Sequence, residues 1–365
     1  MKMKKYIVLI MVLIPLNMLF AQSQSTDDRW LVFLEKYADG YNPDWYGKEM
    51  PAFHFDERLN SENLKGKPVL LDYWATWCSA CRIYAKEFDE IAGKDYYKNN
   101  LQIIGVNIEG ADTRKTGNNS PRKYWEAKGY KYPMVEGASA DASGTAIKNG
   151  FPTIILLDKK GFIRGRWDTY TPQVKDVIKL GVWVLSDTIQ KYTAEQVATE
   201  IRLRNYYKAL FISDQLPKDE VFESFRLRAM LKVSEWDATI YAKELYENAK
   251  NTMSGEAYED FLYNLCSEIV ESQALLTDAN KLGLEIANEL ENRSADYSKD
   301  YIFLDSKAKL YWRTSQRDKA KEYAEKALQT CIDQKVSPVT IDYFKALIDT
   351  YSKPPQEEVT DMNNY

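Results

Sequence analysis

The amino-acid sequence predicts an α/β domain with one central sheet, followed by an all-α domain of helical repeats. In the first half of the chain, short apolar runs alternate with helical patterns, which is typical of α/β folds. From about Thr193 onward the strand signals vanish and apolar residues recur at helical spacing. The length of 365 residues also fits two domains, because a domain usually has about 100 to 200 residues.

Residues 1–21 have the pattern of a Sec signal peptide. Three lysines lie within the first five residues, residues 6–20 are mainly apolar, and Ala21 precedes a polar stretch. We expect cleavage after Ala21. An uncleaved N-terminal anchor is the alternative, because Leu19 is larger than the small residue usually found three positions before the cut. Export to a periplasm or another extracytoplasmic compartment follows, where disulfides are tolerated.

The composition is that of a soluble, folded protein without a nucleic-acid partner. Apolar residues make up 45% of the chain and charged residues 28%, which allows real cores and a soluble surface. The formal net charge is −5, and acidic and basic residues are interspersed along the chain. Nucleic-acid binding proteins usually carry a basic stripe, and this chain has none.

The α/β domain is expected to span residues 50–190, after an N-terminal extension at 22–49 that is rich in Trp and Tyr. Residues 50–55 suggest a short strand entry. The elements expected next are a strand at 69–74, an amphipathic helix at 78–92, a strand at 101–108, a helix at 121–127, a strand at 153–157 and its hairpin partner at 162–167.

Each of these elements has its own signal. The helix at 78–92 counts Ile83, Phe88 and Ile91 among its apolar positions. The strand at 101–108 is almost wholly aliphatic, as expected when both faces of a strand are covered. The turn sequence at 158–161 separates the last two strands, which predicts a hairpin.

A Cys-x-x-Cys pair lies where the first strand turns into the first helix. A helix start offers unpaired N–H groups and the positive end of the helix dipole, so the thiolate of Cys78 is expected to be stabilised and nucleophilic. Cys81 lies one turn further along and can resolve a mixed disulfide formed on Cys78. The spacing therefore predicts a pair that cycles between dithiol and disulfide.

Two other interpretations of the pair remain open at this point. A zinc or iron–sulfur site normally needs four ligands, and the chain adds only Cys266, Cys331 and His54, all distant in sequence. An inert structural disulfide suits an exported protein, but such bridges usually join distant segments and close longer loops. Neither interpretation explains the position at a helix start.

Five separated segments resemble, in the same order, the exported thioredoxins of the TlpA/ResA type: 51–53, 65–68, 74–81, 150–153 and 157–161. The resemblance covers roughly residues 50–187 and implies a thioredoxin-like fold. It also implies thiol–disulfide oxidoreductase activity without a small-molecule cofactor or a metal. Protein thiols and disulfides would be the substrates, and a membrane or periplasmic redox protein would act upstream.

The resemblance also implies roles for individual residues. Pro152 matches the family's cis-proline, which lies beside the reactive sulfurs and exposes backbone to an extended substrate; a plain strand-entry proline is the alternative. Asp72 matches a buried carboxylate with a raised pKa that accepts the proton of Cys81, and an exposed strand aspartate is its alternative. Trp77 and Phe151, together with Pro152, are expected to shape substrate docking.

Three positions depart from known patterns. Ser79 and Ala80 replace a dipeptide that commonly contains proline and that tunes the thiolate, so the redox potential stays open. Tyr84 stands where ResA-like reductases often carry a glutamate, so specificity is expected to differ. Ala75 stands where peroxiredoxins need a threonine, which disfavours a peroxidase.

The second half repeats itself at a period of 41 residues. Small or apolar residues recur in three copies: Ala238, Ala279 and Ala320; Ala242, Gly283 and Ala324; Leu245, Ile286 and Ala327. Three stacked helical hairpins are expected over residues 191–352, which is an α-solenoid suited to binding a protein partner. The copy at 304–328 resembles a tetratricopeptide (TPR) repeat, although the period is longer. The tail at 353–365 is expected to be disordered.

The remaining cysteines and the histidine are expected to be structural. Cys331 takes the position held by Ala249 and Leu290 in the other copies, and Cys266 lies on an apolar helical face, so both should be buried and inert. Whether they form a disulfide stays open. The leading hypothesis is thus an exported thiol–disulfide oxidoreductase, and the rival is a partner-binding scaffold with a redox-inert thioredoxin-like platform.

Overall fold

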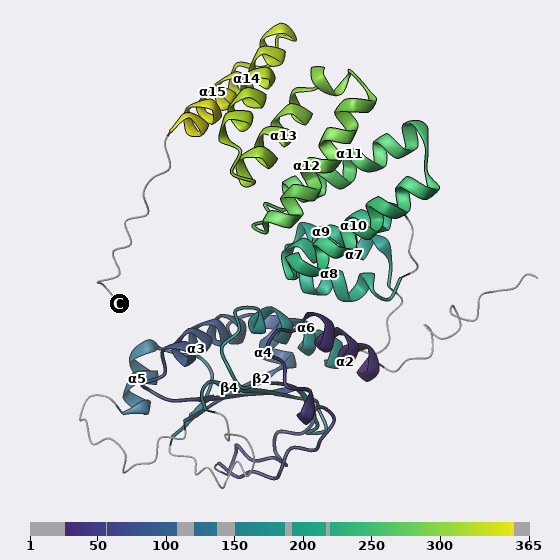
Figure 1. Cartoon of the computed structure of the whole chain (residues 1–365). Helices are drawn as coiled ribbons and strands as arrows, with labels where there is room; N and C mark the ends of the chain where they lie inside the picture. The colour runs from purple at the N-terminus through teal and green to yellow at the C-terminus, as the bar shows by residue number, and fades with distance from the viewer. Residues whose placement is uncertain are drawn as a thin grey trace, which may run out of the picture. The chain divides into compact units, whose positions relative to one another are not determined.

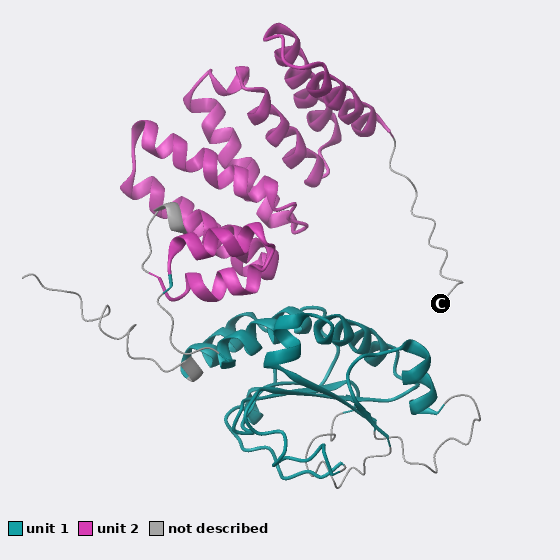
Figure 2. Cartoon of the chain, turned by 180° about the vertical axis from the view of Figure 1, so that it is seen from behind, with its two compact units in different colours: residues 1–192 teal, residues 193–365 magenta. Residues whose placement is uncertain are grey.

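The structure is a computed structural model that describes residues 26–55, 57–107, 120–136, 150–186, 192–216 and 220–353. The chain divides into two compact units, residues 1–192 and 193–365 (Figure 2). The expected signal peptide at 1–21 and the tail beyond residue 353 lie outside the described residues. None of the described helices is both long enough and apolar enough to span a membrane.

The first unit is built on one mixed sheet of five strands in the order β3-β2-β1-β4-β5. The central strands β1 and β2 are parallel, β2 is also parallel to β3, and β4 runs antiparallel to both β1 and β5. The strands are β1 (Val69–Trp74), β2 (Gln102–Asn107), β3 (Met134–Val135), β4 (Thr153–Leu157) and β5 (Ile163–Trp167). This is the α/β domain with one central sheet that the sequence predicts.

Helices pack on one face of this sheet. Figure 1 shows α2, α3, α4 and α6 side by side above the strands, and these helices contact one another. The helical elements of the unit are α2 (Thr26–Tyr37), the 3-10 helix η1 (Pro43–Trp45), α3 (Ser79–Ala92), α4 (Asp95–Asn100), α5 (Pro121–Lys128) and α6 (Val174–Ser186).

Two local features differ from the sequence-based expectations, and a third had no prediction. Ile83 is 46% exposed, because the buried face of α3 follows Cys81, Tyr84 and Phe88 at helical spacing and leaves position 83 outside. Within residues 50–55 only His54 forms an isolated bridge, to Asn60, and no strand forms. The N-terminal extension contains α2, whose buried Trp30 donates from Nε1 to the carbonyl oxygen of Arg164 at 2.8 Å.

The two faces of β1 have different surroundings because its side chains alternate. Val69, Leu71 and Tyr73 face a core cluster that includes Phe53 and Leu64, which come from the chain before the strand. The alternate residues, Asp72 among them, therefore face the helices. A carboxylate thus lies beneath the helical layer, on a strand that is buried along its whole length.

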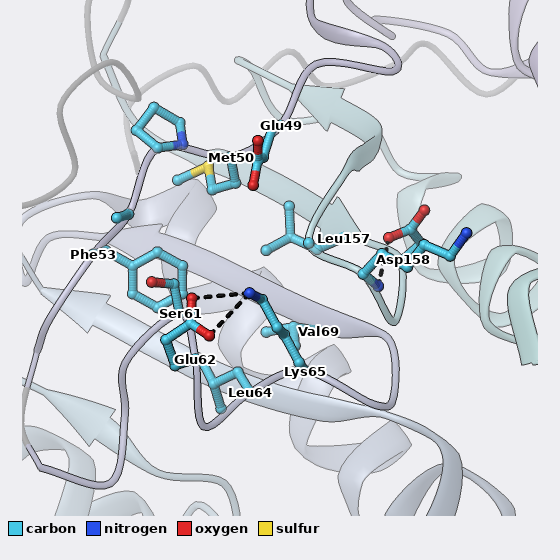
Figure 3. A pocket seen from close by; sticks show the side chains of 14 residues that line it. Glu49, Met50, Phe53, Ser61, Glu62, Leu64, Lys65, Val69, Leu157 and Asp158 are labelled. Atoms are coloured by element: carbon cyan, nitrogen blue, oxygen red, sulfur yellow. Dashed lines mark hydrogen bonds and ion pairs between the residues drawn. The ribbon is translucent and has the colours of Figure 1, made fainter.

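A cavity of about 290 Å³ opens on the face of the sheet opposite the helices (Figure 3). Phe53, Leu64 and Leu157 supply apolar walls, and an ion pair between Lys65 and Glu62 lies beside them. The cavity adjoins Val69 at the start of β1. Since the Cys-x-x-Cys segment follows the end of β1, the cavity lies at the other end of the sheet from the cysteines.

The second unit consists of helices that pack in consecutive pairs, α9 with α10, α11 with α12 and α13 with α14, and each pair also packs against the next. Its elements are α7 (Ala194–Arg202), α8 (Tyr206–Ser213), α9 (Glu220–Val233), α10 (Glu235–Thr252), α11 (Gly255–Glu271), α12 (Thr277–Arg293), the 3-10 helix η2 (Tyr297–Lys299), α13 (Tyr301–Arg313), α14 (Arg317–Asp333) and α15 (Pro338–Ser352). The all-α repeat prediction is confirmed, whereas similarity to TPR repeats stays a prediction.

The small-residue seam of the repeats is buried. Ala238, Ala279 and Ala320 have no exposed surface, and most other positions of the 41-residue repeat are buried as well. Leu245 is only half-buried. Small side chains at these positions let consecutive helix pairs approach closely, which is how a solenoid builds a continuous core.

Candidate active site

Cys78 lies at the first turn of α3, where the chain leaves the end of β1. It is the N-cap residue of the helix, and its Sγ accepts a hydrogen bond from the backbone N–H of Cys81 at 3.1 Å. The sulfur thus occupies the place that an N-cap oxygen usually takes, next to the positive end of the helix dipole. A negative charge on this sulfur would be stabilised by the same N–H group.

The two cysteines are joined in a disulfide, with their Cα atoms 5.3 Å apart. Their exposure differs: Cys78 keeps 7% of its surface exposed, whereas Cys81 is fully buried. An incoming substrate sulfur can therefore reach Cys78 and not Cys81. The asymmetry matches the division into an attacking and a resolving cysteine.

Asp72 lies under α3 as a fully buried carboxylate. Burial raises its pKa from 3.8 to about 7, and a hydrogen bond from Tyr132 partly opposes that rise. The Tyr132 hydroxyl donates to Oδ2 at 3.1 Å, while no described residue donates to Oδ1. A carboxyl group with such a pKa can both accept and release a proton near neutral pH.

The segment before β4 borders the same end of the sheet. The peptide bond between Phe151 and Pro152 is cis, and the pairing of Tyr73 with Thr153 places Pro152 opposite the last residue of β1. Pro152 itself is buried. The side chain of Trp77 is 53% exposed and lies edge-on to the half-buried Phe151, with 5.7 Å between ring centroids.

Tyr84 fills the position where a glutamate is common in the resembling reductases. It is fully buried, and its hydroxyl accepts from the backbone N–H of Thr171 at 2.7 Å and donates to the carbonyl of the same residue at 2.9 Å. The side chain thus ties α3 to the connection between β5 and α6. Tyr84 therefore presents no acid near the cysteines.

The remaining cysteines and the histidine have surroundings of their own. Cys266 and Cys331 are buried free thiols, and burial raises the pKa of Cys266 to about 12. His54 is exposed and forms a bridge with Asn60. Within the described ranges no cluster of His, Cys, Asp or Glu side chains has the arrangement of a metal site.

Tyr132 is the site residue that sequence reasoning missed. It belongs to no motif, and it comes from a short segment ahead of the two-residue strand β3, where periodicity gives no signal. Its side chain meets Asp72 only because the fold brings two segments 60 residues apart into contact. Only the buried carboxylate itself, which requires a hydrogen-bond donor, could have indicated that a partner exists.

Comparisons with known proteins agree with this geometry. Residues 46–166 match the model of the AhpC/TSA family. The chain is 29% identical over 141 residues to a thiol:disulfide interchange protein DsbE of Pseudomonas fluorescens. This match covers 36% of this chain and 70% of that protein. It is 28% identical over 119 residues to the thiol-disulfide oxidoreductase ResA of Bacillus thuringiensis. This match covers 32% of this chain and 65% of that protein.

A shorter match is closer in sequence. The chain is 39% identical over 70 residues to a thioredoxin of Thiocapsa roseopersicina, which covers 19% of this chain and 68% of that protein. These three matches each span about two thirds of the relative's length. Each covers 36% of this chain or less, so they leave most of its length unmatched.

Proposed function

The chain belongs to the thioredoxin-like family of thiol–disulfide oxidoreductases, and from this premise we propose that it is an exported enzyme that exchanges disulfides with protein substrates. The observation that carries the proposal is the combination of a partly exposed, helix-capping Cys78 with a fully buried Cys81. Because only one sulfur is accessible, Cys78 attacks the substrate disulfide, and Cys81 then releases the substrate.

The reaction proceeds in two thiol–disulfide exchanges. The Cys78 thiolate attacks one sulfur of a substrate disulfide, and the other substrate sulfur leaves as a thiolate. Cys81 then attacks the Cys78 sulfur, the second substrate sulfur leaves, and the protein disulfide forms. The substrate is thereby reduced by two electrons and the protein oxidised by two, and the reverse sequence oxidises a substrate dithiol.

Asp72 supplies the proton chemistry of the second exchange. Cys81 must lose its proton before it attacks, and it is fully buried. A carboxylate with a pKa of about 7 can take that proton while remaining partly ionised at neutral pH. In the reverse direction, the same group returns the proton to Cys81.

The substrate docks on the surface beside Cys78. Trp77 offers an exposed ring next to Phe151, and the chain at Pro152 precedes a strand of the sheet. An extended substrate segment can contact the aromatic rings and hydrogen-bond to the backbone there. The proposal therefore includes these three residues as the substrate-binding surface.

The helical unit is proposed to hold a protein partner. Helix-pair solenoids present extended surfaces that suit protein binding, and the second unit has a repeating buried core. The N-terminal pattern supports export to the periplasm or another extracytoplasmic compartment, where a membrane or periplasmic redox protein would reset the pair.

Two cysteine variants test the activity. We expect Cys78→Ser to abolish reduction of a model protein disulfide, because no attacking sulfur remains. Cys81→Ser is expected to keep the first exchange and to accumulate a mixed disulfide, which non-reducing electrophoresis detects. Turnover that both variants retain would contradict the proposal. An unmodified protein that reduces no protein disulfide would favour the scaffold, in which the pair is redox-inert.

A further inference from the structure

Hydrogen bonds of the backbone at residues 131–133 hold Tyr132 in place. Its carbonyl accepts from Nε1 of Trp125 at 3.0 Å, the preceding N–H of Lys131 donates to Asp89 on α3, and the following carbonyl of Pro133 accepts from Gly105 on β2 at 2.9 Å. Neighbouring segments therefore fix Tyr132 from three directions. Its ring is buried and packs edge-on against Trp125.

The hydroxyl of Tyr132 lies between the carboxylate and the helix that carries the cysteines. Its oxygen is 3.1 Å from Oδ2 of Asp72 and 3.5 Å from the carbonyl oxygen of Ala85, one turn after Cys81 on α3. We propose that Tyr132 is a positioning residue for the resolving exchange: its hydroxyl holds Oδ2 of Asp72 and leaves Oδ1 as the oxygen that takes the proton from Cys81.

The same hydroxyl has a partner in both protonation states of Asp72. While the carboxyl group is ionised, Tyr132 donates to Oδ2. Once the Cys81 proton has moved to Asp72, the hydroxyl can turn its own proton to the Ala85 carbonyl. The tyrosine remains neutral throughout, because burial beside Asp72 raises its pKa well above the usual value.

Few other groups act on this carboxylate. The residues paired with Asp72 across the sheet, Gly105 and Ile154, carry no charge. Tyr132 interacts electrostatically with Tyr130 and with Asp89 on α3. Tyr130 also interacts electrostatically with Asp72. Arg166 acts on Tyr73, whose side chain points to the other face of β1. Tyr132 is thus the group that hydrogen-bonds to Asp72 and opposes the effect of burial.

This inference rests on the proposed function and deepens it, since it concerns the proton step of the same pair. A donated hydrogen bond favours the ionised carboxylate. Removing it with Tyr132→Phe, which keeps the ring, should raise the pKa of Asp72 by about one pH unit, a tenfold change in proton affinity. The resolving exchange should then reach half its maximal rate at a correspondingly higher pH.

The first measurement needs no turnover. The pKa of Asp72 is read from the NMR shift of its carboxyl carbon in the disulfide form of the full chain. Tyr130→Phe is the matched control, because it also removes a hydroxyl from the same aromatic cluster, one that is hydrogen-bonded to Tyr124 and not to Asp72. An upward shift in Tyr132→Phe alone supports the inference, and equal values in both variants overturn it.

The second measurement follows the exchange itself. Reduced protein is mixed with dithionitrobenzoate, which releases one coloured thiolate when Cys78 attacks and a second when Cys81 closes the disulfide. The second phase is recorded from about pH 5 to 9, a range that brackets the Asp72 pKa. We expect Tyr132→Phe to move the midpoint of this phase upwards by about one pH unit and to leave the first phase unchanged.

Asp72→Asn separates the two levels of the proposal. If Asp72→Asn abolishes the pH dependence of the second phase and Tyr132→Phe leaves it unmoved, the inference about Tyr132 fails while the proposed function stands. If Asp72→Asn also leaves the pH dependence unmoved, the proton role of Asp72 in the proposed function fails. Adding Tyr132→Phe to Asp72→Asn should change nothing further, because the tyrosine acts through the carboxylate.

Discussion

The residue that most constrains this site is Asp72, because a buried carboxylate is costly to keep. The ionised form loses its hydration in the interior, and one hydrogen bond from Tyr132 compensates only in part. The folded protein consequently favours the protonated form up to about pH 7. Such a cost fits a functional group better than a structural one.

The pH dependence of stability checks this directly. Between pH 3.8 and about 7 the folded state keeps the Asp72 proton while the unfolded state loses it, so stability falls as pH rises through this window. The full difference is about 4 kcal/mol, at about 1.4 kcal/mol for each pH unit. Asp72→Asn should therefore stabilise the protein most above pH 7 and least near pH 4. Urea unfolding of the disulfide form measures this.

A stabilisation by Asp72→Asn that is equal at both ends of this pH range would contradict the raised pKa. Asparagine is the suitable replacement, because its side-chain oxygen can still accept from Tyr132. The comparison therefore removes the charge and keeps the hydrogen bond.

The four cysteines should separate into two classes by reactivity. Cys78 is expected to react with iodoacetamide after mild reduction of the folded protein, because reduction frees its partly exposed sulfur, whereas the fully buried Cys81 is expected to stay unlabelled. Cys266 and Cys331 should react only after unfolding, because both are buried in helix pairs. Mass spectrometry of the alkylated chain counts them, and four labels on the folded protein would contradict the structure.

Much of the site at this scale could be predicted from the sequence. The positions of Cys78 and Asp72 follow from local patterns, a helix start and a charged residue inside an apolar strand. The Tyr132 contact could not be predicted, because it depends on a segment whose conformation is set by three backbone hydrogen bonds to other elements. No local pattern encodes such a contact.

Among the elements, α3 carries the cysteine pair, and Tyr84 fixes it to the connection between β5 and α6. Removing the hydroxyl with Tyr84→Phe leaves the backbone N–H of Thr171 without its partner, whereas the Thr171 carbonyl keeps the hydrogen bond from the N–H of Val174 at 3.1 Å. The loss should cost about 1 to 3 kcal/mol of unfolding free energy, since a buried N–H group is left unsatisfied. Denaturant unfolding measures the loss.

The ring contacts of Tyr84 with Phe88 and Tyr170 survive in this variant, so the measured cost belongs to the hydroxyl. Tyr170→Phe, which leaves the hydrogen bonds of Tyr84 intact, is the control. A Tyr84→Phe protein as stable as the unmodified chain would show that the hydroxyl does not hold α3 against the connection to α6.

Elements with a clear local signal were predictable, whereas α2 and the shortest elements were not. The strand at 153–157 is found at the predicted residues, and the predicted helix at 121–127 is extended by one residue, because each has a clear apolar or capping signal. The two-residue β3 and the six-residue α4 have too few residues to show a period. Their conformations come from packing against the rest of the sheet and its helices.

On the scale of the whole molecule, the two units differ in how sequence encodes them. In the helical unit, each helix pair contacts mainly the neighbouring pairs. The same pattern of buried residues therefore recurs three times in the sequence at a fixed spacing. Ala249, Leu290 and Cys331 are equivalent positions, and all three are buried. In the first unit, nearby strands in space are distant in sequence, so the site depends on contacts that no repeat reveals.

The division after residue 192 predicts that each unit folds without the other. A fragment of residues 26–192 contains the sheet, the cysteine pair and Tyr132, so it should reduce dithionitrobenzoate at the rate of the full chain. A fragment of residues 193–353 should be helical by circular dichroism and unfold cooperatively. An unfolded or aggregated fragment would show that the cores of the two units depend on each other.

The same fragments test the proposed role of the helical unit. With Cys81→Ser in place, the full chain and the 26–192 fragment should trap a small disulfide equally well, because the chemistry belongs to one unit. They should differ in the proteins they trap from an extracytoplasmic extract, because a solenoid adds a second binding surface and raises the effective concentration of its partner. Identical sets of trapped proteins would mean that the cysteine-bearing unit alone selects substrates.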